Sequence, residues 1–194
     1  MFSWRAPTDE QIRDLLAAQV GQPFSYPEVG ATREAPPPGY NFDHHEVLLG
    51  AGDETWRRAK AALSAWKMFP TEMCQLCFPT APLTPGTVVA VRIKTLGLWS
   101  VSLARIVYTI NETIERNASR VERFGFAYGT LPRHVEQGEE IFSVEREADG
   151  SVWYRLAAFS RPRHPLVRLG YPYARLTQAR FRRLSGLAMQ RATK

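Results

Sequence analysis

The fold is decided by residues 139–160, with the sequence EEIFSVEREADGSVWYRLAAFS. In the second half of this stretch, every second residue from Val152 to Ala158 is apolar, which is the pattern of a strand with one buried face. Asp149-Gly150, near the middle, is a strong turn signal. The stretch therefore predicts a β-hairpin, and short connections of this kind favour an antiparallel sheet.

Five further segments upstream have strand character. The clearest is 87–95, in which Val89, Val91 and Ile93 alternate with smaller or charged residues. Because the connections between these segments are short, we expect an antiparallel meander. The predicted strands are 42–49, 73–78, 87–95, 99–110, 123–130, 139–146 and 151–160.

Two short helices are predicted before the meander. Thr8 is expected to cap a helix over 8–19, since Gln11 completes a capping box. A proline-rich stretch, 21–39, follows and predicts an extended loop. Asp53 then caps a second helix, which ends before Pro70.

A long helix is predicted at the C-terminal end, over 165–190, bent near Pro172. Its apolar residues form one stripe at helical spacing, which we expect to pack against the sheet. The stripe consists of Leu169, Tyr173, Leu176, Leu184 and Leu187.

The order of these elements predicts an α+β fold in one domain, residues 1–194. Residues 1–40 supply the N-terminal helix and the proline-rich extension, and residues 41–194 form the body. In the body, a curved antiparallel sheet is gripped by the long C-terminal helix. Such an arrangement often leaves a cavity between sheet and helix.

Three stretches carry a distinctive pattern: FSYPEVGATR at 24–33, FGFAYGTLPRH at 124–134 continuing into EQGEE at 136–140, and FSRP at 159–162. They resemble the bacterial and plant family catalogued as "domain of unknown function 1990". The likeness covers nearly the whole chain, and the family's name assigns no activity.

The predicted element order separately resembles the START-like or Bet v 1-like (SRPBCC) superfamily, whose architecture is called a helix grip. Members of that superfamily bind lipids, sterols, plant hormones and aromatic polyketides, and some catalyse cyclisation or hydrolysis. By analogy of topology, the resemblance implies a hydrophobic small molecule, lipid-like or aromatic, in an internal cavity.

The net charge of +6 is unevenly distributed, because the last 34 residues carry +9 and the preceding 160 sum to −3. Such a basic segment suits a solvated helix face, a peripheral membrane surface or an acidic partner. We expect no nucleic-acid partner, since no recognised binding motif accompanies the charge. Without a secretory signal or an apolar run long enough to span a membrane, a cytoplasmic location is expected.

The two cysteines, Cys74 and Cys77, form a single C-x-x-C pair, whereas a structural zinc site needs four ligands. On a strand, residues three apart point to opposite faces, so we interpret them as small core thiols rather than a metal or redox site. His44 and His45 are adjacent on a strand and cannot share one metal. We therefore predict no metal site, and no motif suggests a cofactor.

The densest polar cluster consists of Tyr128, Arg133, His134, Glu136, Glu139 and Glu140. A carboxylate two residues from a histidine could orient it as a general base. This pattern is the basis of an alternative, cyclase- or hydrolase-like function with His134 supported by Glu136 or Glu139. The other interpretation is a polar loop between strands.

The candidate ligand-binding residues are aromatic side chains expected on the facing surfaces, together with two arginines. Arg161 could hold an acidic ligand group, or it could fasten the last strand to Glu28 of the proline-rich loop. Arg180 could anchor a ligand, or its charged end could extend into water. The candidates are Trp66, Phe126, Tyr128, Tyr154, Arg161, Tyr173 and Arg180. With them, we expect the protein to bind a hydrophobic small molecule.

Overall fold

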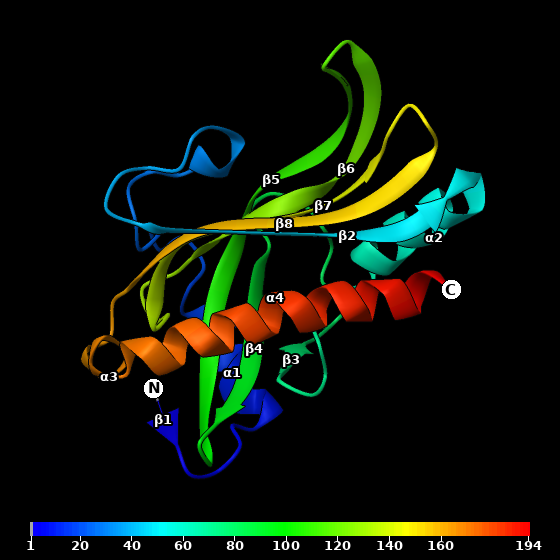
Figure 1. Ribbon diagram of the computed structural model, residues 1–194. Helices are drawn as coiled ribbons and strands as arrows, with labels where there is room; N and C mark the ends of the chain where they lie inside the picture. Colours follow the sequence, from blue (N-terminus) through cyan, green and yellow to red (C-terminus); the bar gives the residue numbers. More distant parts are fainter. Residues whose placement is uncertain (1) are drawn as a thin grey trace.

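The computed structural model describes residues 2–194 and is built around one curved antiparallel sheet (Figure 1). Its strands pair in the order β2-β8-β7-β6-β5-β4-β3, with β1 added beside β5. From β3 to β8 each strand pairs with the next one along the chain, and β2 pairs with β8 at one edge of the sheet. The strands are β1 (Phe2–Ser3), β2 (Asn41–Ala51), β3 (Cys74–Cys77), β4 (Val88–Thr95), β5 (Leu98–Arg116), β6 (Ser119–Thr130), β7 (Glu136–Arg146) and β8 (Ser151–Pro162).

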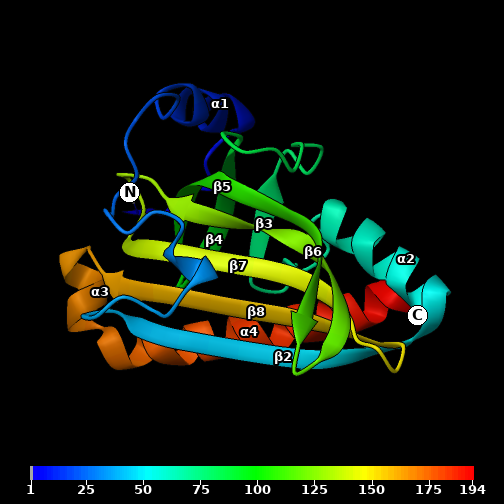
Figure 2. The same ribbon diagram turned by 90° about the horizontal axis from the view of Figure 1, so that it is seen from above.

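The helices flank this sheet, and the longest, α4, runs along β8 and β2 (Figure 2). The predicted α+β helix grip is therefore confirmed. The bend that the sequence predicts near Pro172 occurs at Gly170, where α3 ends and α4 begins. The helical segments are α1 (Asp9–Ala17), the 3-10 turn η1 (Ala31–Arg33), α2 (Gly52–Ser64), α3 (Pro165–Leu169) and α4 (Tyr171–Thr193).

The hairpin of β5 and β6 extends further than the sequence suggests, because both strands continue to a two-residue turn at Asn117 and Ala118. Both turn residues have positive φ, 52° and 59°, as a tight hairpin turn of this hand requires. The extension has few buried side chains, so it lacks the alternation by which strands are recognised. Cross-strand ion pairs such as Arg123–Glu112, at 3.0 Å, lie along it.

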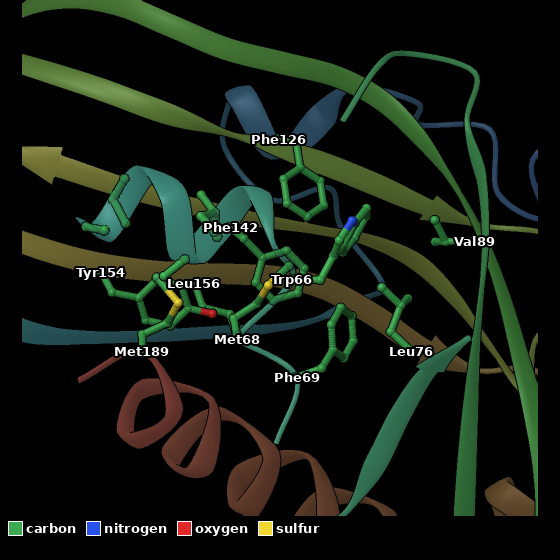
Figure 3. Close-up of a cluster of buried hydrophobic side chains, with 14 of the residues drawn as sticks. Trp66, Met68, Phe69, Leu76, Val89, Phe126, Phe142, Tyr154, Leu156 and Met189 are labelled. Atoms are coloured by element: carbon green, nitrogen blue, oxygen red, sulfur yellow. The ribbon is translucent and has the colours of Figure 1, made fainter. Parts of the chain in front are cut away.

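A packed apolar core fills one end of the concave face, beneath α2 (Figure 3). Trp66 and Phe126 meet edge to face, with ring centroids 4.8 Å apart. The Trp66 indole donates a hydrogen bond to the Ala81 carbonyl, and Tyr154 shares a 2.7 Å hydrogen bond with Ser185 of α4. These rings are fixed by packing and by hydrogen bonds of their polar atoms.

The predicted sheet-facing stripe of the C-terminal helix is wrong for its exposed leucines, although Tyr173 lines the space between the helix and the sheet. Leu169 is 85% exposed and Leu176 is 71% exposed, so both lie on the outer side. The inner side carries small residues, and a Cβ at Gly186 would come within 2.9 Å of the His45 ring. A small residue lets the helix backbone approach β2 closely, and this requirement outweighs the apolar periodicity.

The segment between α1 and β2 covers the opposite, convex face of β7 and β8 (Figure 1). Tyr26 lies edge-on to Phe159, and its hydroxyl would sit only 2.1 Å from a Cβ at position 129. Gly129 is therefore needed for this close approach rather than for a ligand. On the same side, α1 packs Ile12 against a second apolar cluster.

Candidate functional site: a cavity between the sheet and α4

A cavity of about 500 Å³ lies between the concave face of the sheet and the first half of α4. Its volume is within the range of small-molecule sites in proteins, roughly 300–1,000 Å³. The walls come from β3 to β8, from Asp43 on β2, and from both C-terminal helices. The cavity therefore occupies the place where the predicted helix grip would hold a ligand.

The cavity exists because inward-facing side chains change in size along each strand. On β8, the inward residue Leu156 belongs to the core, but Ala158 and Ser160 line the cavity. On β5, Ile106 belongs to the core, whereas Ser102 and Ser100 line the cavity. Small residues leave the space between sheet and helix unfilled.

The boundary between core and cavity is aromatic. Phe69 stacks on Tyr128 with ring centroids 6.5 Å apart, and it contacts Phe181 of α4 at 6.0 Å. Tyr128 also contacts Phe142 at 5.3 Å. Three of these rings, those of Phe69, Tyr128 and Phe181, line the cavity and give it a flat apolar wall.

Glu140 is the most perturbed carboxyl group in the cavity. Burial raises its pKa from 4.5 to about 7, although the Tyr128 hydroxyl donates a 2.7 Å hydrogen bond to Oε2. Burial also raises the pKa of Tyr128 well above its usual value. In the described part of the chain, Oε2 is the carboxyl oxygen of Glu140 that accepts a hydrogen bond, while Oε1 has no donor. A carboxyl group in this state can exchange a proton near neutral pH.

Glu136 lines the same cavity, and its carboxylate accepts hydrogen bonds of 2.7 and 2.8 Å from Gln178 of α4. Burial raises its pKa as well. Gln178 is neutral, so it satisfies the oxygens without compensating their charge. Glu136 and Glu140 thus form an acidic end of the cavity.

His134 also lines the cavity, but it does not meet a carboxylate among the described residues. Its Nδ1 lies 3.1 Å from the backbone nitrogen and 3.0 Å from the backbone oxygen of Glu136. Burial lowers the pKa of His134 to about 4, so the ring is neutral at pH 7. The histidine–carboxylate hydrogen bond on which the acid–base hypothesis depends is therefore not formed.

A third acid that lines the cavity, Asp43, is held by two arginines of α4. Arg175 binds it through two nitrogens at 2.6 and 2.7 Å, and Arg182 binds it at 2.9 Å. This bidentate geometry fixes the position of the helix over β2. Asp43 is buried, and its charge is compensated within the protein.

Glu139 contributes to the cavity wall, but its carboxylate points to the convex face. It accepts hydrogen bonds from the Tyr26 hydroxyl (2.6 Å), from the backbone nitrogens of Gly30 (2.7 Å) and Thr32 (3.0 Å), and from the Thr32 hydroxyl. The side chain is 2% exposed. All its contacts hold the proline-rich segment on the sheet, so the structure separates Glu139 from His134 and Glu136.

The aromatic residues among the predicted ligand-binding residues are divided between the cavity and the packed core. Tyr128 and Tyr173 line the cavity, whereas Trp66, Phe126 and Tyr154 belong to the packed core. The three core side chains fill the space beneath α2, and hydrogen bonds fix Trp66 and Tyr154 there.

The two predicted arginine anchors lie outside the cavity. Arg161 lies 4.4 Å from the centre of the Tyr40 ring, on the convex side, and its guanidinium lies 2.8 Å from the side-chain amide group of Gln137. The Tyr40 hydroxyl in turn donates a 2.7 Å hydrogen bond to Glu28. Arg161 therefore helps to fasten the last strand to the proline-rich loop, through Tyr40 rather than by direct contact with Glu28. Arg180 is exposed on the outer side of α4.

The two cysteines are buried on opposite faces of β3, as the strand spacing predicts. Cys74 belongs to the core beneath α2 and borders the cavity, and Cys77 belongs to the cluster under α1. Burial raises the pKa of Cys74 to about 12, so its thiol stays protonated and unreactive at neutral pH.

Comparison with known proteins gives the family. The model described as "Domain of unknown function (DUF1990)" matches residues 25–188. The chain belongs to this family. A UPF0548 protein of Dictyostelium discoideum is 35% identical over 198 residues, covering 93% of this chain and 90% of the relative. A UPF0548 protein of Deinococcus radiodurans is 34% identical over 191 residues, covering 93% and 92%.

Solved structures share the fold of this DUF1990 chain at low identity. A hypothetical protein from Helicobacter pylori has a TM-score of 0.51 at 14% identity, covering 89% of this chain and 97% of that chain. The structure of Ara h 8.0201 has a TM-score of 0.43 at 13% identity, covering 78% and 99%. The first of these supports the architecture and nothing beyond it.

Sequence reasoning placed Glu140 in the polar cluster of this DUF1990 chain but did not name it as a candidate site residue, although it is the most perturbed carboxyl group of the cavity. It also omitted Asp43, Gln178 and Arg182. One signal was present: Glu140 shares a strand face with Phe142, so it points inward if Phe142, rather than its neighbour Ile141, belongs to the main core. Gln178 and Arg182 were missed because the leucine stripe predicted the wrong inner face of the helix. The leucines are exposed, and Gln178 and Arg182 face the cavity.

Proposed function

We propose that the protein binds an apolar small molecule, lipid-like or aromatic, in the cavity between the sheet and α4. The observation that carries the proposal is the retained hollow of about 500 Å³ with an aromatic wall. Larger side chains at Ser102 or Ala158 would fill such a space and strengthen the core, because unfilled volume forfeits packing contacts. A hollow kept at this cost to stability fits a ligand site.

The test is native mass spectrometry of freshly purified protein, followed by solvent extraction and identification of any released molecule. Uptake of N-phenyl-1-naphthylamine, an apolar fluorophore, is measured in parallel. The variant Ser102→Trp places a bulky ring in the cavity, and Thr109→Trp adds the same ring at an exposed site of β5.

We expect wild type and Thr109→Trp to carry an adduct or to bind the fluorophore, and Ser102→Trp to lose at least about tenfold in affinity. Equal fluorophore binding by all three proteins would place the ligand elsewhere. A bare mass together with no fluorophore binding by wild type would contradict the proposal.

A second candidate function, contact with an anionic membrane surface, is favoured by the rim of the cavity. Leu96 is 78% exposed, and Leu169 and Leu176 are similarly exposed. Their neighbours in the chain line the cavity, and Arg168 and Arg180 flank the two helical leucines. Exposed leucines beside basic residues suit an anionic lipid surface. No described helix is long and apolar enough to cross a membrane.

Cosedimentation with vesicles tests this candidate. Binding to phosphatidylserine-containing vesicles should exceed binding to pure phosphatidylcholine and should weaken as salt rises from 50 to 300 mM. A Leu169→Ser/Leu176→Ser variant should bind less, because both side chains are exposed and contribute little to the fold. Equal binding to both vesicle types would count against it.

A further inference from the structure

The acidic end of the cavity contains two carboxylates without a cation partner in the described part of the chain. Glu136 and Glu140 lie on the cavity side of β7, and the residue between them on that face is Gly138, which has no side chain. Both acids are half-buried, and removing a carboxylate from water is costly unless an opposite charge is near.

The cations that the protein itself places near this end are already engaged. Arg175 and Arg182 are both bound to Asp43 at 2.6 to 2.9 Å. Gln178 and Tyr128 reach Glu136 and Glu140, but both are neutral donors. Burial raises the pKa of both glutamates, although the charge of Arg175 acts to lower the pKa of Glu136 and that of Arg182 acts to lower the pKa of Glu140. The two arginines therefore compensate the buried carboxylates only in part.

We propose that this end of the cavity binds the protonated amine of an otherwise apolar ligand, with Oε1 of Glu140 as the contacting atom and Glu136 as a second negative charge. The proposal rests on the cavity being a ligand site. Oε1 is the carboxyl oxygen of Glu140 without a donor among the described residues, and the aromatic wall beside it suits the ligand's apolar body. An ammonium group supplies both the missing donor and the missing charge.

The proposal predicts pH-dependent binding. At pH 8 Glu140 is mostly ionised and attracts the cation, whereas at pH 5.5 it is mostly protonated and does not. His134 stays neutral over this range, and the arginines stay charged. The other titratable or charged groups acting on this end, from every element packed against it, are Asp43, Cys74, Tyr128, Glu136, Tyr154, Arg175 and Arg182.

The experiment compares decylamine, decanol and decanoate, which share one chain and differ in the headgroup. Each is used below its micelle concentration to displace N-phenyl-1-naphthylamine from wild type at pH 8 and pH 5.5. Glu140→Gln removes the charge at nearly constant shape. Glu115→Gln is the matched control, because Glu115 is exposed on the distal β5–β6 hairpin.

At pH 8 we expect decylamine to displace the fluorophore at about tenfold lower concentration than decanol, the effect of one charged hydrogen bond. This advantage should fall at least fivefold at pH 5.5 and in Glu140→Gln, and it should persist in Glu115→Gln. Decanol binding by Glu140→Gln checks that the cavity is still open.

Each contrary result is distinguishable. If decanol binds but decylamine has no advantage, or if the advantage survives in Glu140→Gln, the amine proposal fails and the apolar cavity stands. Stronger binding of decanoate than of either other probe would mean that Arg182 selects an anion, which also overturns it. If neither the fluorophore nor decanol binds, both this proposal and the ligand site fail.

Discussion

Replacing Glu140 by glutamine should stabilise the ligand-free protein at alkaline pH. The side chain is substantially buried, and its pKa is raised from 4.5 to about 7. Glutamine has nearly the same shape, carries no charge, and its amide oxygen can still accept the hydrogen bond from Tyr128. The substitution therefore removes the cost of burying the charge while keeping the local contact.

The size of the effect follows from the shift in pKa. Each unit of difference between the folded and unfolded states corresponds to about 1.4 kcal/mol, so the free energy of burying the ionised form is about 3 kcal/mol. Because the folded pKa is raised, the stabilising contribution is complete below pH 4.5 and is lost as pH rises to about 7. The advantage of Glu140→Gln in free energy of unfolding should grow over this window from near zero to about 3 kcal/mol.

Urea unfolding followed by tryptophan fluorescence, at half-unit steps from pH 4.5 to 8.5, measures this difference. As pH rises, the contribution of Glu136 to the free energy of unfolding falls, because its pKa is raised. The contribution of His134 grows, because its pKa is lowered. Both residues are present in wild type and variant. Their contributions therefore largely cancel in the comparison. A difference that does not change with pH, or a Glu140→Gln variant less stable than wild type at pH 8, would refute the reasoning.

Three other substitutions probe contacts that hold the fold around the cavity. Glu139→Ala removes the acceptor of four hydrogen bonds from the proline-rich segment and should lower the free energy of unfolding by about 3 kcal/mol. Proteolysis within 21–40 should become faster. Unchanged proteolysis would mean that Glu139 does not hold this segment on the sheet. Gly129→Ala should displace Tyr26 and cost about 1–3 kcal/mol by urea unfolding, and no loss would mean that Tyr26 shifts freely. Asp43→Asn should cost about 2 kcal/mol by the same assay, because two partly exposed arginines lose the charge of their buried partner. Full stability would show that α4 is held by packing alone.

The architecture was predictable because its signals are local. The Asp149-Gly150 turn sets the register of β7 and β8, and Thr8 with Gln11 forms the expected capping box. Where local signals were absent or misleading, the prediction failed. The Asn117-Ala118 turn lacks glycine, and the exposed leucines of α4 imitate a buried stripe. Tertiary contacts, such as the close approach of Gly186 to β2, cannot be predicted from the spacing of apolar residues.

The candidate site was harder to predict because β7 is apolar on both faces. Ile141 packs on the convex side and Phe142 on the concave side. Because both are apolar, the sequence pattern does not tell which of the two preceding acids faces the cavity. The orientation of the two acids depends on the proline-rich segment, which lies more than 100 residues away in sequence. This segment supplies the hydrogen-bond donors to Glu139 in the described part of the chain. Strand geometry already places the two adjacent acids on opposite faces. The long-range contact determines that Glu139, rather than Glu140, is the acid on the convex face.

The two adjacent acids therefore have opposite consequences for the protein. Glu139 accepts four hydrogen bonds and fastens the extension, so its loss should destabilise the fold. Glu140 accepts one and is buried beside a hollow, so loss of its charge should stabilise the fold. A residue that lowers stability where a neutral side chain would fit is best explained by a ligand that compensates its charge, and stability measurements on the two variants separate these roles before any ligand is known.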